Sequence, residues 1–178
     1  PAAIVELVKK AGIVGMSGSG FPTHVKLHPP KDKHVDTLIL NAAECEPFLT
    51  ADHRLLLEEP EAVLSGLALA ARALGVSRVY IALEDNKKDV LPFLKKAGAE
   101  KFAKLVVLPT EYPTGAEKVL VKKVTGRVVP RLGLPLDVGC VVTNVGTMAQ
   151  IARTLRTGLP VIDRVVTVAG AVQNPGNY

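Results

Sequence analysis

Segments typical of strands alternate with segments typical of helices along most of this chain of 178 residues. Short apolar runs, several of them rich in β-branched residues, predict strands at residues 37–40, 78–83, 105–108 and 140–143. Apolar residues at helical spacing predict helices at residues 2–11, 59–74, 89–96, 114–124 and 145–156. Because strands that alternate with helices usually form parallel sheets covered by those helices, the sequence predicts an α/β fold with a mainly parallel sheet.

Composition narrows the classes of function. Apolar residues make up 48% of the chain and charged residues 22%, which suits a globular core, and no apolar stretch approaches the roughly 18 residues that a membrane span needs. The formal net charge is +5, with three Tyr, four Phe and no Trp, which disfavours a nucleic-acid partner. Cys45 and Cys140 belong to no paired motif, so we expect no disulfide framework and a reducing compartment.

The end of the chain differs from the rest. Residues 164–169 alternate weakly and lead into a turn at residues 173–176 (QNPG), which is typical of a hairpin. We therefore expect an α/β domain over residues 1–162 and the beginning of a second domain over residues 163–178. The chain opens at Pro1 without Met or a signal-peptide pattern, so we expect it to be a piece of a longer protein.

A glycine-rich loop occupies residues 15–23 (GMSGSGFPT). Gly15, Gly18 and Gly20 permit positive φ, so successive backbone N–H groups can point into one concavity and bind an anion, phosphate above all. A helix precedes these glycines, and their spacing matches neither a dinucleotide fingerprint nor a Walker loop. The loop thus predicts a cradle for a phosphate or a flat ring, with Lys26 within reach of that phosphate; a merely flexible loop is the alternative.

Polar residues follow the predicted strands, at the edge where parallel sheets bind their ligands. Asn41, Glu44 and Glu46 follow the first strand, and in an extended segment the two carboxylates face one side and Cys45 the other. Three further polar segments follow the other strands, at residues 84–87, 112–118 and 143–147. We expect the four strand ends and the glycine loop to line one crevice suited to a mononucleotide; exposed polar turns are the alternative.

No catalytic acid–base pair or nucleophile emerges from the sequence. The four histidines fall in predicted loops, without metal-ligand spacing and without an arrangement that would activate a cysteine: His24, His28, His34 and His53. The sequence therefore offers no side chains that would catalyse hydrolysis or group transfer, and we predict neither a catalytic residue nor a metal site. A cofactor that brings its own chemistry fits the chain better.

Five motifs occur in a fixed order: GMSGSGFPTHVKL (15–27), NAAECEP (41–47), DHR (52–54), YPTGAEK (112–118) and TNVGT (143–147). In this ordered set the sequence resembles the C subunits of Rnf electron-transport complexes. More distantly, it is similar to the flavin-bearing NADH-oxidising subunit of respiratory complex I and to the cobalamin reductase of propanediol-utilising compartments. The resemblance covers nearly the whole chain, and it implies a Rossmann-like domain that binds FMN and takes hydride from NADH.

The resemblance also implies a set of site residues. In the loop, Gly15, Gly18 and Gly20 would wrap the flavin, and Lys26 would contact its phosphate. The remaining positions that match flavin contacts are Asn41, Glu44, Tyr112, Gly115, Glu117, Asn144 and Thr147. The positions that match contacts with NADH are Phe21 and Glu46.

Further parts are implied outside this chain. Residues 163–178 would begin a β-grasp domain, and a later segment would hold two [4Fe–4S] clusters. The partners would be the other subunits of an electron-transport complex, with the protein peripheral on the inner, cytoplasmic face of the bacterial cell membrane.

The sequence departs from the complex I pattern at four positions. Met16 and Ser17 stand in place of Arg and Gly, Ser19 in place of Ala, and Ala43 in place of Asp. Ser17 must then avoid positive φ or reshape the loop. Two alternatives stay open: a flavoprotein like the cobalamin reductase, and a non-redox scaffold that keeps the fold, which the two serines favour if they close the loop.

Overall fold

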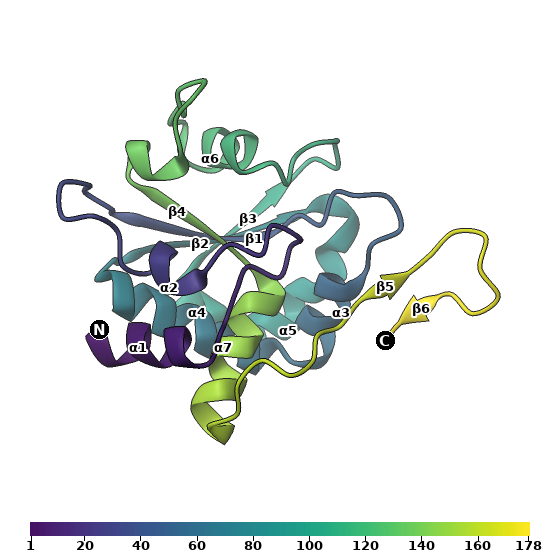
Figure 1. The fold of residues 1–178 in the computed structure, drawn as a ribbon. Coiled ribbons are helices and arrows are strands. Elements are labelled where there is room, and N and C mark those ends of the chain that lie inside the picture. Colours follow the sequence, from purple (N-terminus) through teal and green to yellow (C-terminus); the bar gives the residue numbers. More distant parts are fainter.

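The computed structural model describes residues 1–178 and shows a sheet with helices on both of its faces (Figure 1). The strands are β1 (Thr37–Ala42), β2 (Arg78–Glu84), β3 (Lys104–Leu108) and β4 (Cys140–Asn144). They lie in the order β3-β2-β1-β4, and every neighbouring pair is parallel. The predicted α/β fold with a parallel sheet is confirmed.

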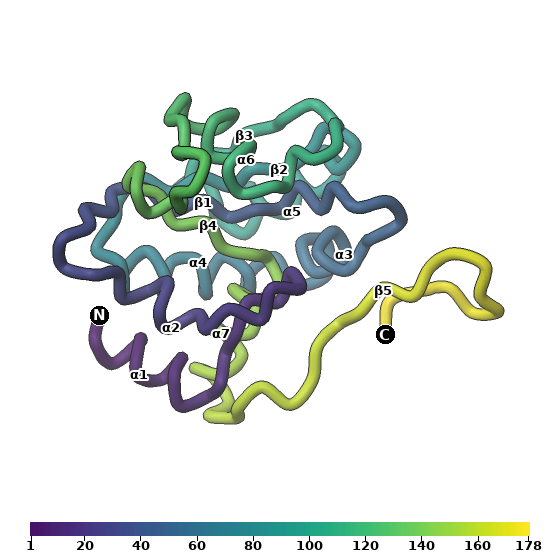
Figure 2. Tube along the Cα trace, turned by 45° about the horizontal axis from the view of Figure 1, so that its top comes forward, coloured from purple at the N-terminus to yellow at the C-terminus, as the bar shows by residue number.

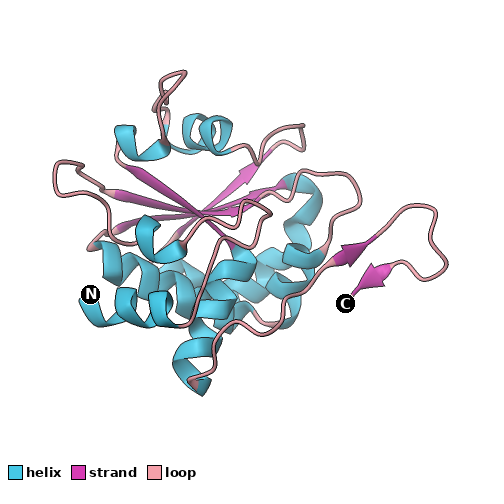
Figure 3. Cartoon of the chain, in the orientation of Figure 1, coloured by secondary structure: helices cyan, strands magenta, loops and turns pink.

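The strand order creates a switch point between β1 and β4. From β1 the chain moves to β2 and then β3, and it returns to the other side of β1 to form β4. The last crossover carries α6 (Glu117–Thr125) over one face, whereas α4 (Pro60–Leu74) and α7 (Val145–Thr157) cover the other (Figure 3). Asn41 and Asn144 are paired in register at the carboxyl ends of β1 and β4, the place where such sheets bind ligands.

Alternate residues of the strands contribute to two cores. Leu38 and Leu40 of β1 belong to the core shared with α4 and α7, whereas Ile39 packs with Leu120 and Val121 of α6. Because β1, β2 and β4 are buried on both faces along most of their length, they are mainly apolar rather than alternating, whereas only Leu108 of the edge strand β3 is buried.

The larger helical layer is built around close contact between α4 and α7. A Cβ on Gly66 of α4 would lie 1.8 Å from the carbonyl oxygen of Met148, so only glycine allows the two backbones to approach this closely. The other helices of the chain are α1 (Ala2–Lys10), α2 (Thr23–Lys26), α3 (Ala51–Glu58) and α5 (Leu91–Lys96).

Two predicted helices begin later than expected. The helix predicted from residue 114 begins at Glu117. The amide N–H of Gly115 donates to Cys45 Sγ (3.3 Å), and its carbonyl, which would accept an intrahelical bond in a helix begun at residue 114, accepts from Asn41 Nδ2 instead (2.8 Å). The helix predicted over residues 89–96 is a kinked 3₁₀ segment, η1 (Asp85–Val90), followed by α5. The remaining 3₁₀ turns are η2 (Ala99–Lys101) and η3 (Pro135–Val138).

Helix α3 was not predicted, and placing His53 in a loop was wrong because it lies in this helix. His24 likewise lies in the short α2. The first N–H groups of α3 donate to remote side chains: those of Asp52 and His53 to the Glu44 carboxylate, at 2.8 and 3.1 Å, and that of Ala51 to Thr167 Oγ1, at 3.2 Å. Caps this far away in the sequence leave no local start signal.

The C-terminal segment leaves the α/β body and forms a small hairpin (Figure 2). Its strands β5 (Thr167–Val168) and β6 (Gly176–Asn177) pair antiparallel, which agrees with the predicted hairpin. The domain boundary after residue 162 stays a prediction. None of the helices is both long enough and apolar enough to cross a membrane.

Candidate functional site

A cavity of about 450 Å³ lies beyond the carboxyl ends of β1 and β4. Its walls come from the glycine loop, the segment after β1, α3, the starts of α6 and α7, and residues 164–167 near the C-terminus. The volume is within the range typical of ligand sites, roughly 300–1,000 Å³. The cavity therefore lies at the switch point of the sheet, as the polar strand ends predict.

Eleven of the thirteen predicted site residues line this cavity: Gly15, Gly18, Phe21, Lys26, Asn41, Glu44, Glu46, Gly115, Glu117, Asn144 and Thr147. Gly20 and Tyr112 do not. Gly20 closes the turn of the loop by donating its N–H to the Gly15 carbonyl (3.2 Å), and the Tyr112 side chain is 77% exposed. Ligand contacts by all thirteen remain predictions.

The glycine loop leaves backbone donors free, although the hydroxyl of Ser19 lies close to Gly15: a Cβ on Gly15 would lie 3.1 Å from Ser19 Oγ. Only Gly18 (φ +105°) and Gly20 (φ +61°) have positive φ in this loop, so Ser17 and Ser19 avoid the strained region. The backbone N–H groups of Ser17, Gly18 and Ser19 donate to no acceptor in the protein. The loop thus offers three consecutive free donors at the cavity wall.

Both backbone polar groups of Met16 form hydrogen bonds with other segments. Its N–H donates to Thr147 Oγ1 of α7 (3.0 Å), and its carbonyl accepts from Arg164 Nη2 (2.7 Å). These two bonds fix the loop to a helix 131 residues away and to the C-terminal segment.

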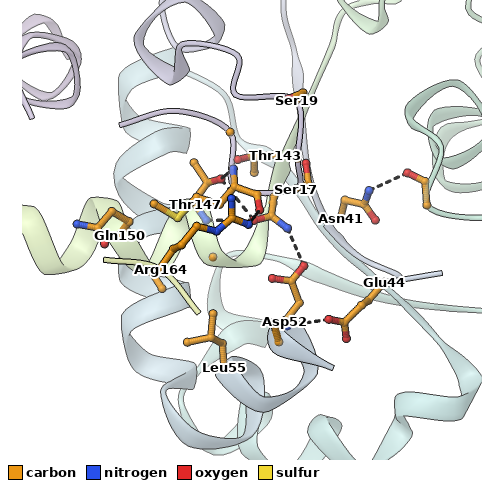
Figure 4. Close-up of a pocket in the computed structure, with 18 of the residues that line it drawn as sticks. Ser17, Ser19, Asn41, Glu44, Asp52, Leu55, Thr143, Thr147, Gln150 and Arg164 are labelled. Carbon is orange, nitrogen blue, oxygen red and sulfur yellow. Dashed lines mark hydrogen bonds between the residues drawn. The ribbon is translucent and has the colours of Figure 1, made fainter. Parts of the chain in front are cut away.

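A polar network joins α7 to α3 at the wall of the cavity (Figure 4). Asn144 caps α7 by accepting from the Thr147 N–H (3.2 Å), and its Nδ2 donates to Asp52 Oδ2 (2.6 Å). Burial and then the Glu44 carboxylate raise the pKa of Asp52 to about 7, against hydrogen bonds from Asn144 and from the backbone of Gly146. Asp52 therefore keeps its proton to a much higher pH than an ordinary aspartate does.

The segment after β1 is not extended, which corrects the expectation that Glu44 and Glu46 simply share one face. Glu44 has φ +47° and its carboxylate is used to cap α3, although both residues line the cavity. Cys45 was expected to face away, yet it also lines the cavity. The left-handed turn at Glu44 breaks the two-residue alternation on which both expectations depended.

The polar segment after β2 lies beneath this turn and does not line the crevice, contrary to expectation. Lys87 Nζ donates to the carbonyls of Ala43 (2.9 Å) and Glu44 (3.3 Å). Lys87 also lies 3.5 Å from Glu84 Oε2, in a pair whose side chains are only 9% and 1% exposed. Lys87 and Glu84 at this strand end therefore support the loop after β1.

Lys26 reaches the cavity already paired. Its Nζ lies 2.7 Å from Glu117 Oε1 and donates to the Val142 carbonyl at 3.1 Å. The pair ties α2 to the start of α6, and it leaves Lys26 partly neutralised as a partner for a phosphate.

Three residues of the site were missed as functional candidates. Asp52 stands in the DHR motif, but its role depends on burial that the sequence does not display. Arg164 and Thr167 belong to the segment assigned to the next domain, and they reach the cavity only through the path of the chain after α7.

Comparison with known proteins places this chain in a family. Residues 8–153 match the family described as Nuo51 FMN-binding domain. The chain is 51% identical over 175 residues to the C subunit of the Na(+)-translocating ferredoxin:NAD(+) oxidoreductase complex of Acetobacterium woodii. It is 49% identical over 172 residues to the C subunit of the proton-translocating complex of Clostridium ljungdahlii.

These alignments cover 97% and 96% of this chain but only 40% and 38% of the two relatives. A solved structure of an NAD+-reducing [NiFe]-hydrogenase in the H2-reduced state superposes with a TM-score of 0.84 at 28% identity, over 99% of this chain and 36% of that one. The chain thus spans about two fifths of the length of these relatives. By the match over residues 8–153, it belongs to the family of the Nuo51 FMN-binding domain.

Proposed function

We propose that the chain is the flavin module of an Rnf-type electron-transport complex, which binds FMN and accepts electrons from NADH. The observation that carries the proposal is the glycine loop, whose three free N–H groups lie at a cavity on the switch point of the sheet. Phosphate groups are the usual ligands of such donors.

The residues of the cavity fit FMN. Gly15 and Gly18 present bare backbone to the cavity. A Cβ on Gly146 would lie 3.3 Å from Asn144 Oδ1 and 3.7 Å from Asp52 Oδ1, so the absence of a side chain keeps the start of α7 open. Free N–H donors suit a phosphate, and the amide and carboxyl groups of the segment after β1 suit the polar edge of a flavin ring.

Bound FMN supplies the redox chemistry, because it takes two electrons as hydride and releases them singly. The chain orients that cofactor and its substrate. Phe21, 43% exposed, and Glu46 lie at the wall of the cavity, where we assign them to NADH. Lys26 and the loop are assigned to the phosphate, and Asn41, Glu44, Gly115, Glu117, Asn144 and Thr147 to the rest of the flavin.

The names of the relatives support the same function. Ferredoxin:NAD(+) oxidoreductase complexes need a carrier between a two-electron and a one-electron partner, which flavin provides. We propose that electrons leave to [4Fe–4S] clusters outside this chain, that the partners are other subunits, and that the complex lies on the cytoplasmic face of the membrane. Ser17 and Ser19 avoid positive φ, and the N–H groups of residues 17–19 stay without acceptors in the protein, which favours the flavin module over a non-redox scaffold.

Titration with FMN tests the proposal. Quenching of flavin fluorescence by the chain at tens of micromolar is expected, and unchanged fluorescence would contradict the function. Gly18→Leu should abolish quenching because the side chain strains the loop at φ +105°. Gly170→Leu is the matched control: Gly170 has φ +94° and equally open surroundings but lies outside this cavity, so FMN should still bind.

A further inference from the structure

The cavity wall formed by residues 164–167, called here the C-terminal strap, lies outside the matched residues 8–153. It follows α7 and passes the glycine loop before it reaches β5. The strap is joined to the rest of the site at two points: Arg164 donates to the Met16 carbonyl, and Thr167 Oγ1 accepts from the N–H groups of Thr50 and Ala51, both at 3.2 Å.

Arg164 differs from the other cations of the cavity in its charge balance. Lys26 is paired with Glu117, and Arg153 is paired with Glu59. Arg164 forms no ion pair, and its hydrogen bond to the neutral Met16 carbonyl leaves its charge uncompensated. It is thus the unpaired cation on a wall that otherwise carries several carboxylates.

Its position relative to the free donors is equally specific. The carbonyl that holds Arg164 belongs to Met16, the residue directly before the free N–H groups of residues 17–19. Figure 4 shows Arg164 reaching into the region where Ser17 and Thr147 lie. A guanidinium has five N–H donors in a fixed fork, so one bond to the backbone leaves donors for an anion beside the loop.

We propose that Arg164 is a specificity-determining residue that contacts the phosphate of the flavin and makes the site prefer FMN to uncharged riboflavin. The inference rests on the proposed function, since it assigns one part of the same cofactor to one side chain. It also assigns the strap to the flavin site, whereas the sequence predicted only that these residues begin a second domain.

Affinities of FMN and riboflavin, measured by fluorescence quenching, test the inference in the full chain. Arg164→Met keeps an apolar stem and removes the charge. FMN binding should weaken by about tenfold, as expected for one charged hydrogen bond, whereas riboflavin binding should stay the same. Arg164→Lys should restore part of the preference. Equal losses for both ligands, or no loss for either, would overturn the inference.

Arg156→Met is the control, because Arg156 lies exposed in the last turn of α7 and its side chain has no hydrogen-bond or ion-pair partner. Inorganic phosphate separates this inference from the function. The amide chemical shifts of residues 17–19 are followed by NMR during titration with phosphate, against chloride at equal ionic strength. The apparent Kd for phosphate should be about tenfold higher in Arg164→Met than in the wild type. If no flavin binds but this difference appears, the function fails and the anion contact stands; if phosphate moves both chains alike, the contact fails.

Discussion

Replacing Asp52 by Asn should stabilise the chain relative to wild type, by an amount that grows as the pH rises. Burial, followed by repulsion from Glu44, raises the pKa of Asp52 from its ordinary 3.8 to about 7. The folded state therefore favours the protonated acid. The stability that this gives is complete below about pH 4 and is lost as the pH rises to 7, and a residue that cannot ionise escapes the loss.

The structure sets the size of the effect. The whole difference in pKa corresponds to about 4 kcal/mol, at ~1.4 kcal/mol per pH unit. Because Asp52 is only half-buried and lines the cavity, we expect about half of this difference, ~2 kcal/mol. The hydrogen bond from Asn144 Nδ2 survives in Asp52→Asn, because the carboxamide keeps an oxygen where Oδ2 accepts that bond at 2.6 Å.

Urea unfolding of wild type and Asp52→Asn at pH 4, 6 and 8 measures this directly. The free energy of unfolding of the variant, relative to wild type, should grow by ~2 kcal/mol between pH 4 and 8. Asp163→Asn, at an exposed acid with no hydrogen-bond partner, should show no such growth. A difference between Asp52→Asn and wild type that stays constant with pH would refute the reasoning.

Three further changes test the packing and charge of the fold. Lys87→Met should destabilise the chain by about 3–5 kcal/mol in urea unfolding, because it leaves Glu84 buried and charged. The double variant with Glu84→Gln should recover part of this loss, and an equal loss in both variants would count against the ion pair. Gly66→Ala should lower the thermal midpoint by well over 5 °C, since its Cβ would collide with the backbone of α7; an unchanged midpoint would contradict this contact. The Arg127 guanidinium lowers the pKa of Asp36, so Asp36→Asn should lower the free energy of unfolding by about 1 kcal/mol at pH 7 and by progressively less as the pH falls below 4. Urea unfolding at pH 7 and pH 3 measures this, and a loss independent of pH would argue against the ion pair.

The layers of the fold could be predicted because their signals are local. Strands β1, β2 and β4 are buried along most of their length, so their residues are mainly apolar. Helix α4 carries its own boundaries, with Pro60 in the first turn and Gly75 at φ +71° after the end. Such patterns do not depend on where the rest of the chain lies.

The details of the site could not be predicted because they depend on remote partners. Helix α3 is capped by Glu44 and Thr167, and Gly115 is withheld from α6 by bonds to Asn41 and Cys45. The motif resemblance found eleven residues of the cavity wall, whereas the simple alternation of side chains after β1 failed at the positive φ of Glu44. Local patterns located the cavity, but not the conformation of its acidic segment.

The remote cap of α3 has a consequence for how the molecule matures. During synthesis the first turn of this helix emerges more than one hundred residues ahead of the hydroxyl that receives its N–H groups. Until Thr167 has left the ribosome, that end of the helix lacks one of its acceptors, and the wall of the cavity formed by the strap does not yet exist. We therefore expect a nascent chain to complete this cavity late, after the hairpin has formed, and not while the sheet is still being assembled.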